Sequence, residues 1–245
     1  MTLTLPSGLT LIPTPLQEGL PLEPVALAWL KVASTQPETL LLVEEHKAAR
    51  TRWLRWGLPR EAIDRFICYN EHSSEKILPE TLSSLKSGCN ALLMSDGGLP
   101  AFCDPGRNLV DACHEAGIRV TSSPFPNSIA LSIALSGFDH REFHFCGFLP
   151  ASSAERKKAL ETISRNQTST LVLMDTPYRL QTLLSDIAGS SLKMRRIFLA
   201  TELNGPGEAL YRGRIEDILK KTSGSKKLEF VVVIESVRSS KPSDH

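Results

Sequence analysis

A turn rich in glycine, proline and aspartate, residues 94–106, lies between an apolar run and a helical pattern. The run before it, residues 89–94, is typical of a buried strand, and the apolar spacing of residues 107–116 is typical of a helix. In an open α/β sheet such a turn lies at the carboxyl end of the strands, where ligands bind. Gly97 and Gly98 let the backbone approach a ligand closely, and Asp96 adds a carboxylate suited to hydroxyls or to a cation. We predict a binding loop here; the alternative is an ordinary polar loop.

Strands alternate with helices along the rest of the chain, which favours βαβ units. In the first half, the patterns predict strands at residues 9–12, 39–43, 66–69, 89–94 and 118–121, and helices at 25–32, 46–56, 75–87 and 107–116. A segment with two prolines, residues 122–127, interrupts the alternation. Beyond it we expect helices at 128–135, 153–165 and 177–188, and strands at 143–146, 170–174, 195–201 and 228–235. The fold class is therefore α/β, with two α/β domains of mainly parallel sheets, residues 1–121 and 122–245.

The composition is ordinary for a globular protein of 245 residues: 41% of the residues are apolar and the formal net charge is +1. The five cysteines form no CxxC pair, which suits reduced thiols in the cytoplasm. We expect no membrane span and no secretion signal. His140 and His144 are four residues apart but lack a third ligand, so we expect no metal site.

Several basic clusters could contact phosphates, although solvated surface is the commoner role of such groups. The net charge near zero means that any affinity for RNA must come from such local groups. No aromatic motif of the RNA-recognition type is visible in the sequence. The clusters are Arg50 with Arg52 and Arg55, Arg156 with Lys157 and Lys158, Lys193 with Arg195 and Arg196, and Lys226 with Lys227.

Six short motifs follow one another in a fixed order: Thr14-Pro15, Tyr69 with Glu71-His72, residues 95–100 with Asp104-Pro105-Gly106, residues 147–150, Pro177-Tyr178-Arg179, and residues 200–203. Together they resemble the tetrapyrrole (corrin/porphyrin) methylase superfamily, whose members use S-adenosylmethionine. Within it, the set is most similar to the branch of small-subunit ribosomal RNA 2′-O-ribose methyltransferases. The resemblance extends from about residue 9 to residue 235.

The resemblance implies two α/β domains with S-adenosylmethionine bound in the cleft between them, and a homodimer. Apolar side chains would enclose the adenine, and the helix start at Asn127-Ser128 would offer N–H groups to the carboxylate of the methyl donor. The cofactor-binding residues implied are Pro15, Ser95, Asp96, Gly97, Gly98, Leu99, Phe102, Asn127, Ser128, Ile129, Met174 and Leu203.

The function predicted is that of an S-adenosylmethionine-dependent methyltransferase acting on RNA, by resemblance on a ribose 2′-hydroxyl of small-subunit rRNA. A hydroxyl acceptor benefits from a general base, for which the candidates are Glu202, His72 and Asp104. One alternative is a methyltransferase acting on a small molecule such as a tetrapyrrole-like compound. Another is a regulatory protein that binds the methyl donor without turnover. The loop Leu16-Gln17-Glu18-Gly19, where the branch carries Ile-Gly-Asn-Leu, favours that second alternative.

Overall fold

The computed structural model describes residues 4–17, 19–125, 127–224 and 227–237. Two parts of the sequence interpretation, Glu18 of the altered loop and Lys226 of a basic cluster, lie outside these residues. The chain divides into two compact units, residues 1–125 and 126–245. The boundary expected from the sequence, between residues 121 and 122, lies at the end of the last strand of the first unit.

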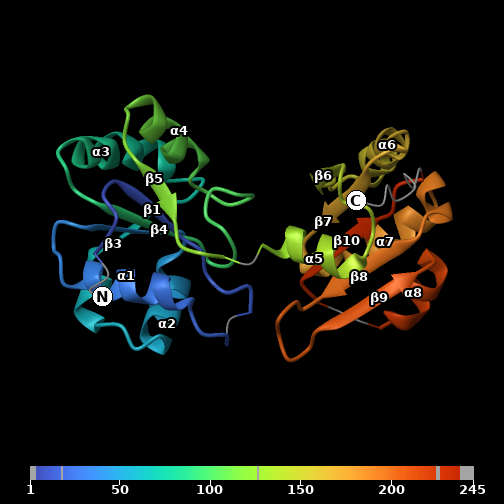
Figure 1. Cartoon of the computed structure of the whole chain (residues 1–245), viewed down its shortest axis with the longest axis horizontal. Helices are drawn as coiled ribbons and strands as arrows, with labels where there is room; N and C mark the ends of the chain where they lie inside the picture. The colour runs from blue at the N-terminus through green and yellow to red at the C-terminus, as the bar shows by residue number, and fades with distance from the viewer. Residues whose placement is uncertain (1–3, 18, 126, 225–226, 238–245) are drawn as a thin grey trace, which may run out of the picture. The chain divides into compact units, whose positions relative to one another are not determined.

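The first unit contains a sheet of five parallel strands in the order β3-β2-β4-β1-β5 (Figure 1). Continuous apolar runs form its central strands, as expected where helices cover both faces of a parallel sheet. The strands are β1 (Leu9–Ile12), β2 (Leu40–Val43), β3 (Phe66–Cys68), β4 (Ala91–Met94) and β5 (Val120–Ser122).

Two helices pack on each face of this sheet. Helices α1 (Pro24–Ser34) and α2 (His46–Arg55) share an apolar cluster with Val43 and Met94. Helices α3 (Ser74–Lys86) and α4 (Arg107–Glu115) share the opposite cluster with Leu42 and Leu93. A short 3-10 helix, η1 (Arg60–Arg65), precedes β3. The strands and helices expected in this half are thus confirmed, with their ends shifted by a residue or two.

The second unit contains a mixed sheet in the order β6-β7-β10-β8-β9. Only β6 and β7 pair in parallel, whereas β10 runs antiparallel to β7 and β8, and β9 runs antiparallel to β8. The strands are β6 (Phe143–Phe148), β7 (Thr170–Met174), β8 (Ile197–Thr201), β9 (Ala209–Gly213) and β10 (Phe230–Ile234). The α/β class is confirmed, and the parallel arrangement is complete only in the first sheet.

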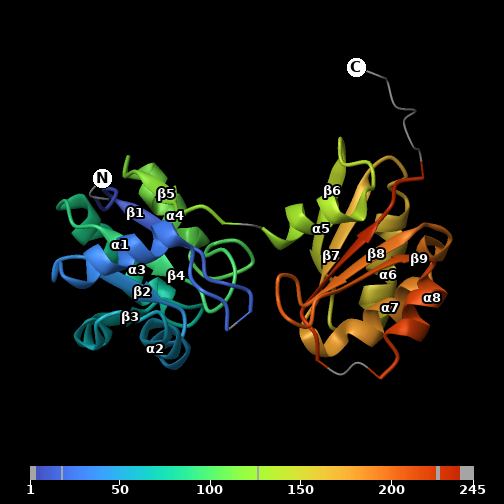
Figure 2. The same ribbon diagram turned by 60° about the horizontal axis from the view of Figure 1, so that its bottom comes forward.

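Figure 2 shows the helices of the second unit on the two faces of its sheet. Helix α5 (Ser128–Ser136) packs on one face in a cluster with Val172 and Val231. On the other face, α6 (Ser153–Ser164), α7 (Leu180–Ala188) and α8 (Ile215–Lys221) share a core with Leu173 and Val232. The turns η2 (Pro177–Arg179) and η3 (Ser191–Met194) precede α7 and β8.

The sequence interpretation missed β9 and α8. Strand β9 is at the edge of its sheet and alternates between half-buried and exposed residues, so it carries no continuous apolar run. Helix α8 has seven residues and no side-chain cap. None of the helices in the described residues is long and apolar enough to cross a membrane.

Gly8, which leads into the central strand β1, occupies a position that only glycine fits. Its φ is +87°, and a Cβ built there would lie 2.3 Å from the backbone oxygen of Arg119. We expect Gly8→Ala to lower the free energy of unfolding by about 2–4 kcal/mol, because left-handed strain and an unrelieved backbone clash add. Denaturant unfolding measures the change. Gly57→Ala is the control, since its φ is +68° but nothing lies within 4 Å; an equal loss in both variants would rule out the clash.

Candidate functional site

The carboxyl ends of β2 and β4 form the point where the connections of the first sheet diverge. The two strands are neighbours, with Val43 opposite Met94. From β2 the chain continues through α2 on one face to β3, and from β4 it continues through α4 on the other face to β5. Ligands of open α/β sheets bind where neighbouring connections part in this way. The residues that follow the two strands, Glu44 and Ser95, therefore begin the candidate site.

Backbone hydrogen bonds join the loop after β4 to the residues that follow β1. Thr14 and Gly98 exchange two backbone hydrogen bonds of 2.9 and 3.0 Å. The Thr14 hydroxyl donates to the Ser95 carbonyl at 3.1 Å, and the Ser95 hydroxyl donates to the Gly98 carbonyl at 3.1 Å. Gly98 has a φ of +97°, which disfavours other residues. These bonds place Pro15, the residue after Thr14, next to residues 95–98; their shared role in cofactor binding stays a prediction.

Three carboxylates converge on this edge of the sheet. The backbone N–H of Asp96 donates to the Glu44 carboxylate at 2.9 Å. Burial, and then the Glu44 charge, raise the pKa of Asp96 to about 6. The same two causes raise the pKa of Asp104 to about 7, against a hydrogen bond with Ser95 that lowers it. Carboxylates held close together with raised pKa values mark a site suited to a cationic or hydroxyl-bearing ligand.

One oxygen of Asp96, Oδ1, is buried and has no hydrogen-bond partner among the described residues. A buried carboxylate oxygen without a partner is costly, so a ligand with an O–H or N–H group would satisfy it. Across the described part of the chain, no group of three or more His, Cys, Asp or Glu side chains is arranged to hold a metal ion.

Arg52, on α2, belongs to this loop and not to a separate basic surface. Its Nη1 donates to the Pro15 carbonyl at 3.0 Å, and its charge lowers the pKa of Asp96. A Cβ built at Gly97 would lie 3.7 Å from its Nη2. The sequence grouped Arg52 with exposed Arg50 and Arg55, since the spacing alone does not show that it is half-buried.

The remaining predicted residues of the first unit lie in two different settings. Leu99 is half-buried and Phe102 is 40% exposed, in a loop where Ala101 and Cys103 both have positive φ. His72 follows β3 and its side chain is 87% exposed, with Glu71 as an ion-pair partner at 3.5 Å. Only Asp104, of the base candidates in this unit, is held beside Asp96.

The predicted residues of the second unit gather around α5 and the ends of two strands. Asn127 caps α5, and its Oδ1 accepts hydrogen bonds from the N–H groups of Ile129 and Ala130. Because these two N–H groups are already paired, fewer free N–H groups remain at the start of α5, whose first residue is Ser128. Ile129 and Leu203 are buried in the apolar core on this face of the sheet, and Met174 packs against that core.

Glu202, the third base candidate, is engaged with the backbone. Its φ is +50°, and its carboxylate accepts a hydrogen bond of 2.6 Å from the Glu229 N–H. Its own N–H donates to the Glu229 carbonyl at 2.9 Å. These two hydrogen bonds give Glu202 a structural role in the turn after β8.

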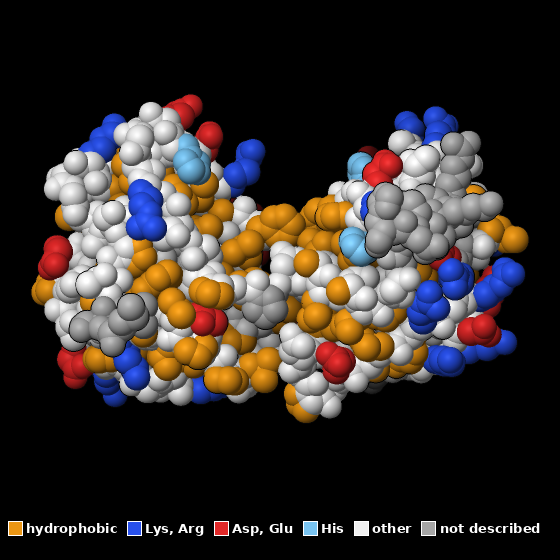
Figure 3. All heavy atoms as spheres, viewed as in Figure 1, with side chains coloured by type: hydrophobic (Ala, Val, Ile, Leu, Met, Phe, Trp, Pro, Cys, Tyr) orange, Lys and Arg blue, Asp and Glu red, His pale blue; other side chains and the backbone are white. Residues whose placement is uncertain are grey.

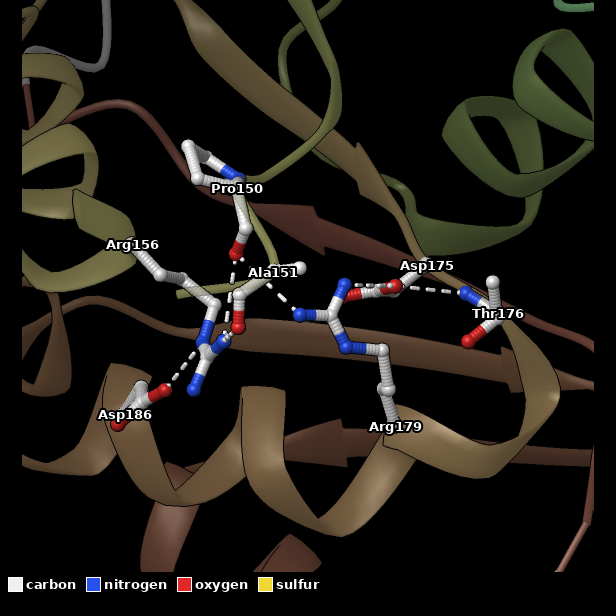
Figure 4. A network of polar contacts seen from close by, with 7 residues as sticks. All are labelled: Pro150, Ala151, Arg156, Asp175, Thr176, Arg179 and Asp186. Atoms are coloured by element: carbon white, nitrogen blue, oxygen red, sulfur yellow. Dashed lines mark hydrogen bonds and ion pairs between the residues drawn. The ribbon is translucent and has the colours of Figure 1, made fainter. Parts of the chain in front are cut away.

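Two arginines, Arg156 and Arg179, organise the loops after β6 and β7 (Figure 4). Arg179 donates to Asp175 at 3.1 Å and to the Pro150 carbonyl at 3.3 Å. Arg156 is 4% exposed, pairs with Asp186 at 2.5 Å and donates to the Pro150 and Ala151 carbonyls. Arg156 is thus structural, and the phosphate contact considered for it is not available to a guanidinium that is buried and paired with Asp186.

The chain matches the tetrapyrrole (corrin/porphyrin) methylases over residues 25–219. It belongs to the tetrapyrrole methylase family. Among curated relatives, it is 32% identical over 69% of its length to "Ribosomal RNA small subunit methyltransferase I" of Thermotoga maritima, of which it covers 75%. It is also 32% identical over 70% of its length to the protein of that name from Escherichia coli O157:H7, of which it covers 60%. The predicted branch of this family is thereby confirmed.

Solved structures show the same fold at low sequence identity. A diphthine synthase superposes with a TM-score of 0.64 at 13% identity, with 93% of this chain and 89% of that chain covered. A uroporphyrin-III-C-methyltransferase from Thermus thermophilus superposes with a TM-score of 0.51 at 18% identity, with 94% and 95% covered. At such identities the likeness establishes the tetrapyrrole methylase architecture alone.

The raised pKa of Asp104 predicts that its ionised carboxylate lowers the stability of the ligand-free protein. Between about pH 4 and 7 the folded state binds more protons than the unfolded state, so stability falls as the pH rises through that window. We expect Asp104→Asn to raise the Tm at pH 8, because it removes a negative charge that is partly buried beside Glu44. The gain should be roughly 2–4 °C, or about 1 kcal/mol, since solvent screens this partly exposed group. At pH 4 the gain should vanish. Exposed Asp111 on α4 provides the control Asp111→Asn; a Tm gain independent of pH would contradict the assignment.

Proposed function

We propose that the protein is an S-adenosylmethionine-dependent methyltransferase whose acceptor is small-subunit ribosomal RNA. Membership of the methylase family and the names of its relatives support the reaction and the acceptor. The observation that carries the site is the convergence of Glu44, Asp96 and Asp104 where the connections of β2 and β4 diverge. By resemblance to the branch, the atom methylated is a ribose 2′-hydroxyl oxygen.

The residues of the first unit fit S-adenosylmethionine chemically. This molecule supplies a methyl group on a positively charged sulfur, together with an ammonium group and two ribose hydroxyls. Asp96 Oδ1, buried without a partner, would accept a hydrogen bond from such a group. Gly97 and Gly98 leave room for a ligand against the backbone, and Arg52 holds the Pro15 carbonyl in place. The contribution predicted for Asn127, Ser128, Ile129, Met174 and Leu203 stays a prediction.

Asp104 is the base candidate whose surroundings suit proton transfer near neutral pH. A general base works best when its pKa is close to the working pH, and burial beside Glu44 moves Asp104 there. His72 is largely exposed, and Glu202 is bonded to the backbone of Glu229. We therefore favour Asp104 to accept the proton of the attacking hydroxyl, with positioning of the two reactants supplying most of the rate.

Transfer of a labelled methyl group tests the reaction and the acceptor together. Purified protein and labelled S-adenosylmethionine are mixed with small ribosomal subunits, transfer RNA, and a small-molecule extract. We expect label in the small-subunit rRNA, in a nucleotide resistant to alkaline cleavage, because 2′-O-methylation removes the attacking hydroxyl. Label confined to the small-molecule pool would favour the tetrapyrrole-like acceptor. Binding of S-adenosylmethionine with no transfer to any pool would favour the regulatory alternative.

Affinity for the methyl donor should depend on pH through the carboxylates. As the pH falls from 8 to 5.5, Asp96 and Asp104 take up protons, and we expect S-adenosylmethionine to bind about tenfold more weakly. S-adenosylhomocysteine lacks the sulfonium charge and should show a smaller change. Calorimetry measures both.

Asp96→Asn should weaken binding of the methyl donor at pH 8 by about ten- to a hundredfold with no loss of Tm. A lower Tm with unchanged affinity would make Asp96 a turn residue only.

A further inference from the structure

Tyr178 is an aromatic side chain that the fold presents to solvent. It lies in the η2 turn after β7, and 71% of its side chain is exposed. Its chain neighbours are a proline and Arg179, and Lys227 lies over its ring, so it does not join an apolar patch. An exposed tyrosine in polar surroundings is poorly placed to stabilise the fold, and this raises the question of what it contacts.

The backbone beneath Tyr178 is held firmly from three sides. The buried Asp175 carboxylate accepts hydrogen bonds from the Thr176 N–H at 2.7 Å and from Arg179 at 3.1 Å (Figure 4). The Arg179 N–H donates to the Thr176 carbonyl at 2.9 Å. The Pro177 carbonyl accepts from the Leu228 N–H at 3.4 Å. An aromatic ring carried by such a fixed turn loses little freedom when a partner binds, which favours recognition by stacking.

One lysine contacts the Tyr178 ring, and two more lie at the end of α8. The Lys227 ammonium lies 5.0 Å from the centre of the Tyr178 ring. Gln181, at the start of α7, donates to the Thr222 carbonyl at 2.7 Å and so fixes the end of α8, where Lys220 and Lys221 are exposed. The acidic residues of α8 are in its first turn, at the other end of the helix. Figure 3 shows Lys and Arg side chains over the region that carries α8.

We propose that Tyr178 and Lys227 bind single-stranded RNA, with a base stacked on the tyrosine ring and the flanking phosphates at Lys227 and Lys221. This inference rests on the proposed RNA acceptor and assigns it a contact outside the carboxylate site. Stacking of bases on aromatic rings beside a cation is how single strands are bound without sequence preference. A stable interface with a folded protein buries about 800 Å² on each partner, far more than one tyrosine provides. The pair was not visible in the sequence because its two members come from distant segments.

The test is binding of a single-stranded oligoribonucleotide that contains 2-aminopurine, whose fluorescence is quenched by stacking. We expect Tyr178→Ala to weaken binding about ten- to a hundredfold and to abolish the quenching, while Tyr178→Trp retains both. Lys227→Gln should reduce the slope of log affinity against log salt by about one. Met194→Ala is the matched control, because Met194 is 68% exposed in the same unit beside Lys193.

Separate measurements distinguish failure of this inference from failure of the proposed function. Calorimetry with S-adenosylmethionine should give the same affinity for wild type and Tyr178→Ala. If wild type methylates rRNA while Tyr178→Ala binds the oligoribonucleotide as tightly and quenches as strongly, the inference is overturned and the function stands. If wild type transfers no methyl group to RNA but quenching depends on Tyr178, the acceptor is wrong and the RNA contact stands. Absence of binding by wild type overturns the inference.

Discussion

The pairing of β2 with β4 is the constraint on which the candidate site depends. With Val43 opposite Met94, the chain leaves both strands at the same level, and Glu44 meets the backbone of Asp96. The strands are buried on both faces, so hydrophobic burial fixes this register. A slip of one residue would exchange the side chains that β4 presents to the two apolar clusters, and it would separate Glu44 from Asp96. Stability of the core and geometry of the site are thus set by the same contacts.

Carboxylates have opposite surroundings at two places in the chain. In the second unit, Asp175 and Asp186 each face an arginine, and the pairs tie loops together. In the first unit, Glu44, Asp96 and Asp104 face one another, and burial raises two pKa values. Leaving like charges together opposes folding, and the proposed ligand would relieve this by supplying positive charge and hydrogen-bond donors. The residue types alone do not distinguish these roles; their neighbours do.

Much of the first unit could be predicted from the sequence, because buried parallel strands such as β2 and β4 are continuous apolar runs. A loop at residues 95–98 was also predictable from its paired glycines after such a strand, and its role in binding stays a prediction. Arg52 and Arg156 could not be assigned, because their carbonyl partners are fixed by tertiary packing. Strand β9 was missed for a related reason: an edge strand needs apolar residues on one face only, and β9 buries few of those.

The Pro150 carbonyl joins two segments that lie far apart in the sequence. Arg179, from the Pro-x-Arg motif, and Arg156, from α6, both donate to it, and it ends the Gly-Phe-Leu-Pro motif. A carbonyl has two lone pairs, so one oxygen can accept from both guanidinium groups. Each arginine is neutralised by its own aspartate, so neither carries unpaired charge into the core. The loops after the parallel strands β6 and β7 are therefore locked together, and Tyr178 and Met174 keep fixed positions on either side of Asp175.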